Sequence, residues 1–350
     1  MKSTKKNRIL IRATNWIGDS VMSLPALEHL KQSFPNSYIC VLLRPWVLPI
    51  FESHPAVDDF IIYDKKGQKL QDLKNLLRII KVIKRKNFDI AILFQNAFEA
   101  ALIAYFSGIK TRIGLNTDLR SALLTHPVKR KSMQHHIKNY LDIISTLGIK
   151  VQDKFPVLYL KNEYITKAKD ILIHVGTNSN SIIVGLAPGA MYGPAKRWPV
   201  EYFSKIGDWA VKRWNAKVVI MGSNKEYEIC AKVADLMSKK AINISGKTSL
   251  GVSMAIIKRC NIFVSNDSGL MHIAAALEVP TIGIFGSTDP YATGPKGIYV
   301  KVIKHDIPCS PCFRRECPYS LECLYSISPE EVWTEMEEMA SFVIEKKYFL

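Results

Sequence analysis

The segment from residue 264 to residue 276 constrains the fold of this chain more than any other stretch. Residues 261–265 are mostly β-branched and aromatic, which predicts a short buried strand. Residues 270–277 are rich in alanine and predict a helix. The four small residues between them, 266–269, suit a tight turn and a helix N-cap. A strand, turn and helix in this order present the N–H groups of the helix start to a ligand such as phosphate. An ordinary βα junction has the same pattern, so the segment alone leaves both interpretations open.

Two neighbouring loops favour the phosphate interpretation. Residues 281–285 predict an apolar strand, and residues 286–295 after it are small or hydroxyl-bearing. Residues 182–187 predict another strand, followed by a Gly- and Pro-rich loop that carries Lys196 and Arg197. Three such loops at the carboxyl ends of parallel strands predict a nucleotide-diphosphate pocket.

Strand and helix patterns alternate along the whole chain, which predicts an α/β protein with doubly wound parallel sheets. At 350 residues the chain suits two domains. We expect a first domain over residues 1–175, a linker at 176–181, a second domain over 182–328 and a final helix over 329–350. The sequence contains neither Gly-x-Gly-x-x-Gly after a strand nor a P-loop motif, which argues against a dinucleotide dehydrogenase and a P-loop NTPase.

The net charge of +17 is concentrated in the first part of the chain. Residues 1–150 hold 24 Lys and Arg against 11 Asp and Glu, whereas residues 151–350 hold 24 against 20. The first domain should therefore attract an anionic partner, either a nucleic acid or a phosphorylated glycolipid at a membrane. The basic runs 81–86 and 129–131 contain no aromatic residues, which disfavours nucleic acid. Apolar runs are too short for a membrane span or a secretory signal, so we expect a cytoplasmic protein.

Several motifs resemble the bacterial lipopolysaccharide heptosyltransferases, glycosyltransferase family 9, and most closely the heptosyltransferase II branch. The matching stretches are Asn-Trp-Ile-Gly-Asp at 15–19, Lys-Arg-Trp-Pro at 196–199, Asp-Ser-Gly-Leu-Met-His at 267–272 and Phe-Gly-Ser-Thr-Asp-Pro at 285–290. The resemblance implies the GT-B architecture, in which two Rossmann-like domains face a cleft, and a final helix that crosses back onto the first domain. It also implies inverting transfer of heptose from ADP-heptose to the lipopolysaccharide inner core, with no cofactor required. The alternatives are heptosyltransferase I or III, another nucleotide-sugar transferase, or a non-catalytic nucleic-acid-binding protein.

Glycosyl transfer requires a base for the acceptor hydroxyl and positive groups for the departing diphosphate. Asp19 follows the first βα turn and could be that base or simply a helix cap; the resemblance assigns it the catalytic carboxylate. The resemblance likewise places Lys196 at the donor diphosphate. The other donor-binding candidates lie in the loops of the second domain: Arg197, Asn224, Asp267, Ser268, Gly269, Leu270 and His272.

Residues 120–133 look irregular and basic, so we expect a mobile loop over the cleft. The resemblance implies that its anionic partner is a phosphorylated Kdo–lipid A-type acceptor at the inner membrane surface. The acceptor-binding candidates are Asn15, Arg120, Lys129, Arg130 and Lys131. Cys309, Cys312, Cys317 and Cys323 have spacing compatible with zinc. We favour reduced structural cysteines over a zinc site, because three prolines keep this segment compact, and we expect no metal at the active site.

Overall fold

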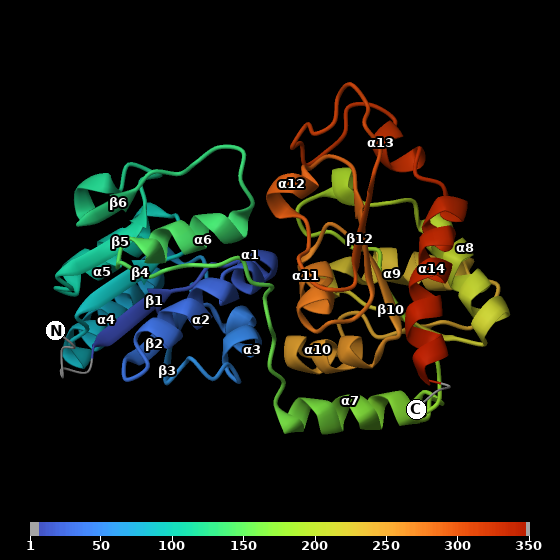
Figure 1. Ribbon diagram of the computed structural model, residues 1–350, viewed down its shortest axis with the longest axis horizontal. Helices are drawn as coiled ribbons and strands as arrows, with labels where there is room; N and C mark the ends of the chain where they lie inside the picture. The colour runs from blue at the N-terminus through green and yellow to red at the C-terminus, as the bar shows by residue number, and fades with distance from the viewer. Residues whose placement is uncertain (1–6, 348–350) are drawn as a thin grey trace. The chain divides into compact units, whose positions relative to one another are not determined.

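The computed structural model describes residues 7–347, with side chains placed through Ser341. The chain divides into two compact units, Met1–Tyr159 and Leu160–Leu350, drawn from blue to green and from green to red in Figure 1. Each unit has its own parallel six-stranded sheet with helices on both faces. The doubly wound fold predicted from the alternation of patterns is confirmed.

The first unit has the strand order β3-β2-β1-β4-β5-β6. Helices α2 and α6 pack together on one face, and α4 and α5 pack together on the other. The core between the sheet and the α4–α5 layer consists of alternate strand residues such as Leu10 and Leu93, together with Ile79 and Ile83. The bounds are β1 (Arg8–Arg12), α1 (Ile17–Met22), α2 (Leu24–Ser33), β2 (Tyr38–Leu43), η1 (Pro45–Val47), α3 (Leu48–Phe51), β3 (Asp59–Ile62), α4 (Lys69–Lys86), β4 (Ile90–Leu93), α5 (Phe98–Phe106), β5 (Thr111–Leu115), η2 (Ser121–Leu123), β6 (His126–Val128) and α6 (His136–Ser145).

The second unit repeats this plan, with the strand order β12-β11-β10-β7-β8-β9. Trp198 and Phe203 are fully buried in its main core, which includes residues of β7, β10, β11, α8, α9 and α14. The bounds are α7 (Asn162–His174), β7 (Ile183–Ala187), η3 (Pro194–Lys196), α8 (Val200–Trp214), β8 (Lys217–Ile220), η4 (Asn224–Glu226), α9 (Tyr227–Leu236), β9 (Ile242–Asn243), α10 (Leu250–Arg259), β10 (Ile262–Asn266), α11 (Gly269–Ala276), β11 (Thr281–Phe285), α12 (Pro290–Thr293), β12 (Val300–Lys304), α13 (Glu322–Tyr325) and α14 (Pro329–Lys347).

Strand order determines where a ligand can bind in each unit. In both sheets the first three strands of the unit follow one another from the centre toward one edge. The last three follow one another from the centre toward the other edge. The point of reversal lies between β1 and β4 in the first unit and between β7 and β10 in the second. In open parallel sheets a crevice forms at this point, beyond the carboxyl ends of the strands.

The domain boundary differs from the one predicted from sequence. The linker was expected at residues 176–181, but the units separate after Tyr159, and α7 packs against α10 of the second unit. A polar helix followed by a Gly- and Asn-rich turn suggested the end of the first domain. The contacts of α7 instead make this helix the first one of the second unit. The final helix, expected to return to the first domain, packs against α8, β10 and β11 of the second. There the Trp333 ring stacks on Trp214.

Three local features of the first unit add to what the sequence predicted. The helical segment that contains Asp19 is interrupted at Ser23, and Pro25 lies in the first turn of α2, a position that proline tolerates. Residues 120–133 are more ordered than the expected mobile loop, because they contain η2 and an additional strand, β6. Three leucines on the apolar face of α4 are exposed: Leu70, Leu73 and Leu77.

Candidate active site

In the first unit, the turn after β1 places Asp19 at the point where the strand order reverses. The Thr14 and Ser20 hydroxyls lie 2.9 Å apart, and both side chains are buried, so they fix the turn against the first helix. Asp19 lies in the first turn of α1. A carboxylate there interacts favourably with the helix dipole.

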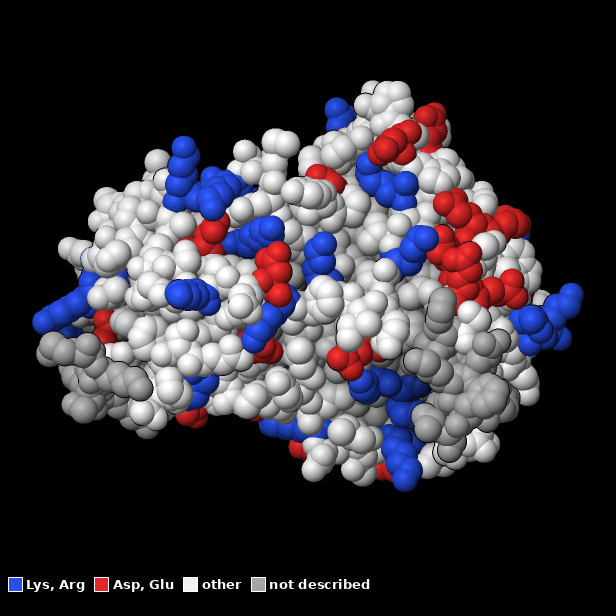
Figure 2. Space-filling view, in the orientation of Figure 1, with Lys and Arg blue, Asp and Glu red and all other residues white. Residues whose placement is uncertain are grey.

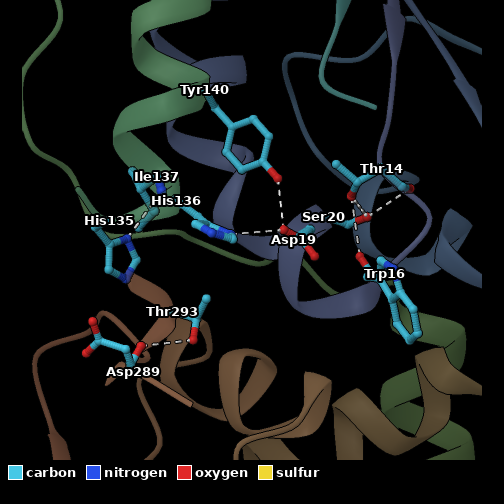
Figure 3. Close-up of polar contacts among 10 residues, drawn as sticks. All are labelled: Thr14, Trp16, Asp19, Ser20, His135, His136, Ile137, Tyr140, Asp289 and Thr293. Atoms are coloured by element: carbon cyan, nitrogen blue, oxygen red, sulfur yellow. Dashed lines mark hydrogen bonds and ion pairs between the residues drawn. The ribbon is translucent and has the colours of Figure 1, made fainter. Parts of the chain in front are cut away.

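Two side chains of α6 contact the Asp19 carboxylate (Figure 3). The Tyr140 hydroxyl donates a hydrogen bond to Asp19 Oδ1 over 3.1 Å, and His136 Nδ1 lies 3.4 Å from the same oxygen. The preceding residue, His135, has a different role, because its Nδ1 accepts a hydrogen bond from the Ile137 N–H and caps α6. Asp19 is therefore held by a helix more than a hundred residues away in sequence.

Burial and the charge of Asp19 both raise the pKa of Tyr140 well above its ordinary value. The phenol therefore stays protonated and remains a donor to the carboxylate. Arg130 has a smaller, opposite effect on the same pKa, which places its charge near this group. Neither Tyr140 nor His136 was identified from sequence, because a tyrosine within a helix and a histidine at its start carry no distinctive pattern.

In the second unit, an ion pair joins two of the three predicted loops. Lys196 Nζ lies 2.5 Å from Asp267 Oδ2, and the Thr288 hydroxyl donates to the same oxygen over 2.6 Å. These residues follow β7, β10 and β11, so all three loops meet as predicted. Side-chain exposure is only 13% for Lys196 and 6% for Asp267, which strengthens their attraction. The Lys196 ammonium also lies 4.7 Å from the Tyr192 ring centroid.

Asn266, a buried residue at the end of β10 that was not singled out from sequence, fixes the backbone of the loop after β7 at both of its ends. Its side-chain amide donates to the Pro188 carbonyl over 2.7 Å and accepts from the Trp198 N–H over 3.0 Å. The neighbouring Ser268 is the N-cap of α11, and its hydroxyl lies 3.1 Å from that of Ser265. The start of α11 therefore lies beside the Lys196–Asp267 pair.

The remaining donor-binding candidates lie in the first turns of α11 and in the loops after β7 and β8. Gly269 and Leu270 begin α11 and are partly exposed, whereas His272, one turn later, is buried. Arg197 donates to the Ala190 carbonyl over 3.4 Å within the loop after β7. Asn224 lies in the exposed loop after β8, at the side of β7 away from β10.

The acceptor-binding candidates of the first unit separate into buried and exposed residues. Arg120 is fully buried, and it donates to the carbonyls of Leu115 and Gln95 at the ends of β5 and β4. Burial lowers its pKa to about 10. Arg120 is therefore part of the sheet edge, in contrast to the mobile loop residue we expected. The exposed basic residues are Lys129, Arg130 and Lys131, of which Lys131 pairs with Asp142 over 3.2 Å.

Asn15, the fifth acceptor candidate, lies in the turn after β1. Its side-chain oxygen accepts a hydrogen bond from Arg12, and its carbonyl accepts one from the Trp46 indole. Arg12 and Trp46 were not recognised from sequence, because an arginine at a strand end and a tryptophan in a loop carry no distinctive pattern.

All four cysteines of the segment 309–323 are free thiols and line one cavity of about 310 Å³. Burial, followed by the charges of the other three, raises the pKa of Cys323 to about 11. Within the part of the chain that the structure describes, no group of three or more His, Cys, Asp or Glu side chains is arranged to hold a metal ion. Nor does any helix of that part have the length and apolar character needed to cross a membrane.

Two Rossmann-type units with polar groups at their strand-order reversals have the GT-B architecture of glycosyltransferases. A crystal structure of a family 9 glycosyltransferase from Veillonella parvula superposes with a TM-score of 0.85 at 26% identity, covering 95% of this chain and 97% of that one. The ADP-heptose lipopolysaccharide heptosyltransferase II of E. coli gives a TM-score of 0.83 at 24% identity, covering 97% and 99%. The predicted GT-B fold is thereby confirmed.

Sequence comparison gives the family. The model for glycosyltransferase family 9 (heptosyltransferase) matches residues 76–322. Lipooligosaccharide heptosyltransferase 2 of Haemophilus ducreyi is 32% identical over 311 residues, covering 85% of this chain and 88% of the relative. The Haemophilus influenzae protein of the same name is 30% identical over 345 residues, covering 95% and 99%. The chain belongs to glycosyltransferase family 9, the heptosyltransferases, and is an enzyme of glycosyl transfer.

The buried ion pair makes a prediction about stability. Lys196→Ala leaves the Asp267 carboxylate buried without its cation, which should lower the free energy of unfolding by about 3–5 kcal/mol. The double variant Lys196→Ala/Asp267→Asn should lose less than Lys196→Ala alone, because the uncompensated charge is gone. Denaturant unfolding of the three proteins measures both effects. Lys212→Ala, which removes an exposed lysine of α8, should change stability by less than about 0.5 kcal/mol. A double variant that loses as much stability as Lys196→Ala, or more, would show that no uncompensated charge is left in the single variant.

Proposed function

We propose that this protein is a heptosyltransferase II, which moves heptose from ADP-heptose to the lipopolysaccharide inner core with inversion at the anomeric carbon. The observation that carries the proposal is the position of Asp19, a carboxylate held by Tyr140 at the strand-order reversal of the first unit. Relatives named lipooligosaccharide heptosyltransferase 2 that match most of the chain support the choice of substrates.

In the proposed reaction Asp19 takes the proton of an acceptor hydroxyl. The hydroxyl oxygen attacks the anomeric carbon of the heptose, the bond from that carbon to the diphosphate breaks, and ADP leaves with the bonding electrons. Lys196 and the N–H groups at the start of α11 stabilise the charge that develops on the diphosphate. Because these groups supply positive charge, we propose that transfer needs no metal cofactor.

We assign the acceptor to the first unit on the basis of charge. The exposed residues Lys129, Arg130 and Lys131 lie between β6 and α6, where Figure 2 shows Lys and Arg side chains on the visible face. They are suited to phosphate groups of a Kdo–lipid A-type acceptor. Acidic side chains gather instead where α14 of the second unit runs.

Mass spectrometry of the product formed from ADP-heptose and purified inner-core acceptors tests this proposal directly. A product heavier by one heptose residue, formed in the presence of EDTA, is the expected result. Acceptors that already carry one heptose and acceptors that carry none separate heptosyltransferase II from heptosyltransferase I. Transfer from another nucleotide sugar in preference to ADP-heptose would overturn the assignment.

Replacing the proposed base should remove catalysis but preserve the fold. Asp19→Asn keeps the size of the side chain and its ability to accept from Tyr140, but it cannot take the acceptor proton. We expect turnover to fall at least about a hundredfold, the usual contribution of a general base, with unchanged ADP affinity in calorimetry. Turnover close to normal in a folded variant would dismiss Asp19 as the base.

Tyr140→Phe tests whether the hydrogen bond from the Tyr140 hydroxyl changes how readily the Asp19 carboxylate is protonated. The phenol donates to the ionised carboxylate and so favours the charged form. Without it Asp19 is easier to protonate, so the acidic limb of the kcat/KM profile should move to higher pH by about 0.5–1 unit. Tyr105→Phe, at a half-exposed tyrosine of α5, is the matched control. An unmoved acidic limb would mean that Tyr140 only packs against the turn.

We further propose that the enzyme is cytoplasmic and docks on the inner face of the membrane through α4. The exposed Leu70, Leu73 and Leu77 share one face of this helix, with exposed fractions of 78%, 52% and 59%. Exposed basic residues flank them: Lys69, Lys74, Arg78 and Lys81. An apolar stripe bordered by positive charge suits an anionic lipid surface, at which each basic residue contributes about 1 kcal/mol.

Vesicle sedimentation tests the α4 surface. The protein should bind phosphatidylglycerol vesicles more tightly than phosphatidylcholine vesicles, and the double variant Leu73→Glu/Leu77→Glu should bind at least about tenfold more weakly. Leu236→Glu, at a half-exposed leucine of α9, should bind like the unmodified protein. Equal binding by all three proteins would exclude α4 as the docking helix.

A further inference from the structure

Two arginines are buried at the carboxyl edge of the first sheet, beside the turn that carries Asp19. Arg12 ends β1 and Arg44 directly follows β2, and their side chains are 3% and 7% exposed. Burial and then the charge of Arg44 lower the pKa of Arg12 to about 10. Two guanidinium groups that repel each other in a buried position are costly unless an anion compensates them.

The hydrogen bonds of this pair leave part of its donor capacity unused. Arg12 donates to the carbonyls of Ala13 and Leu42 and to the Asn15 side chain, and Arg44 donates to the Tyr63 carbonyl. The Nε atom of each arginine is buried without a hydrogen-bond partner among the described residues. The nearby Glu99 does not balance both charges, because it also pairs with Lys65.

Two exposed tryptophans lie at the same edge. Trp46 is 50% exposed, its indole N–H donates to the Asn15 carbonyl over 2.8 Å, and its ring centroid is 5.8 Å from the Arg44 guanidinium. Trp16, the residue after Asn15, is 57% exposed, and Figure 3 shows its ring directed away from the Thr14–Ser20 contact. Exposed indole rings next to unbalanced positive charge provide an apolar face and a counter-charge for one ligand.

We propose that Arg12, Arg44, Trp16 and Trp46 form a subsite for a sugar that carries an oxyanion. The arginines compensate its carboxylate or phosphate, and an indole ring packs against the apolar face of its ring. This inference rests on the proposed function in one respect: the sugar would be the part of the acceptor next to the hydroxyl that Asp19 deprotonates. The subsite is distinct from the exposed segment 129–131, which we assign to other phosphates of the acceptor.

Three small probes with the same ring size test the subsite without requiring transfer activity. Glucuronate carries a carboxylate, glucose 6-phosphate carries a phosphate, and glucose carries neither. Binding is followed by ligand-observed NMR in the presence of saturating ADP, which occupies the diphosphate site of the second unit. We expect one or both anionic sugars to bind and glucose to bind at least about tenfold more weakly, the difference that one charge-assisted hydrogen bond makes. The two anions distinguish a carboxylate from a phosphate.

Variants then locate the binding. Arg44→Gln should weaken anionic-sugar binding at least about tenfold, whereas Arg85→Gln, which removes an exposed charge near the end of α4, should have no effect. Trp46→Phe should weaken binding while leaving the buried arginines in place. If Arg44→Gln fails to fold, Arg44→Lys and Trp46→Phe carry the test. Unchanged affinity in Trp46→Phe together with either Arg44 variant, or equal binding of glucose and the anions, would overturn the proposal.

The outcome is separable from that of the proposed function. If anionic sugars bind at this edge but ADP-heptose is not a donor, the subsite stands and the heptosyltransferase II assignment fails. If heptose is transferred but the acceptor KM is the same in Arg44→Lys, Trp46→Phe and the unmodified protein, the assignment stands and the subsite is wrong.

Discussion

The reversal of strand order in each sheet is the constraint on which the candidate sites depend. At that reversal, neighbouring connections leave toward opposite faces, so the loop after the first strand of each unit has open space beside it. In the first unit this loop leads to Asp19, and in the second it carries Lys196. The same topology thus presents a carboxylate in one unit and an ammonium group in the other, and the sequence of one short loop decides which chemistry each unit can contribute.

The two units stabilise these groups by different electrostatic means. Asp19 is partly exposed and accepts a hydrogen bond from a buried neutral phenol, so its negative charge remains available to a substrate proton. Lys196 is paired with a buried carboxylate, which fixes its position before any ligand arrives. A neutral hydrogen-bond donor leaves the negative charge of a base uncompensated, whereas a partner of opposite charge fixes the position of a cationic side chain.

The sequence was sufficient for features that depend on local pattern and insufficient for those that depend on distant contacts. Most strands, and the approach of the loops after β7, β10 and β11, follow from apolar runs and turn residues. The contact of Tyr140 with Asp19 spans 121 residues and has no local signal. Arg120 was misassigned because charge suggests exposure, yet carbonyl groups at the strand ends satisfy its donors inside the sheet edge. The exposure of the α4 leucines could not be predicted, because helical periodicity does not reveal how much of an apolar face the sheet covers.

The pairing of Lys196 with Asp267 also affects which anions the second unit can distinguish. A bare phosphate that approaches the ammonium group meets an adjacent carboxylate, so attraction and repulsion largely cancel. A ligand that presents a hydroxyl group next to its phosphate can donate to Asp267 while its phosphate oxygens face Lys196, and both partners are then satisfied. If the second unit binds the donor as we propose, charge neutrality in the pair would disfavour inorganic phosphate and favour phosphate esters attached to a polyhydroxylated group.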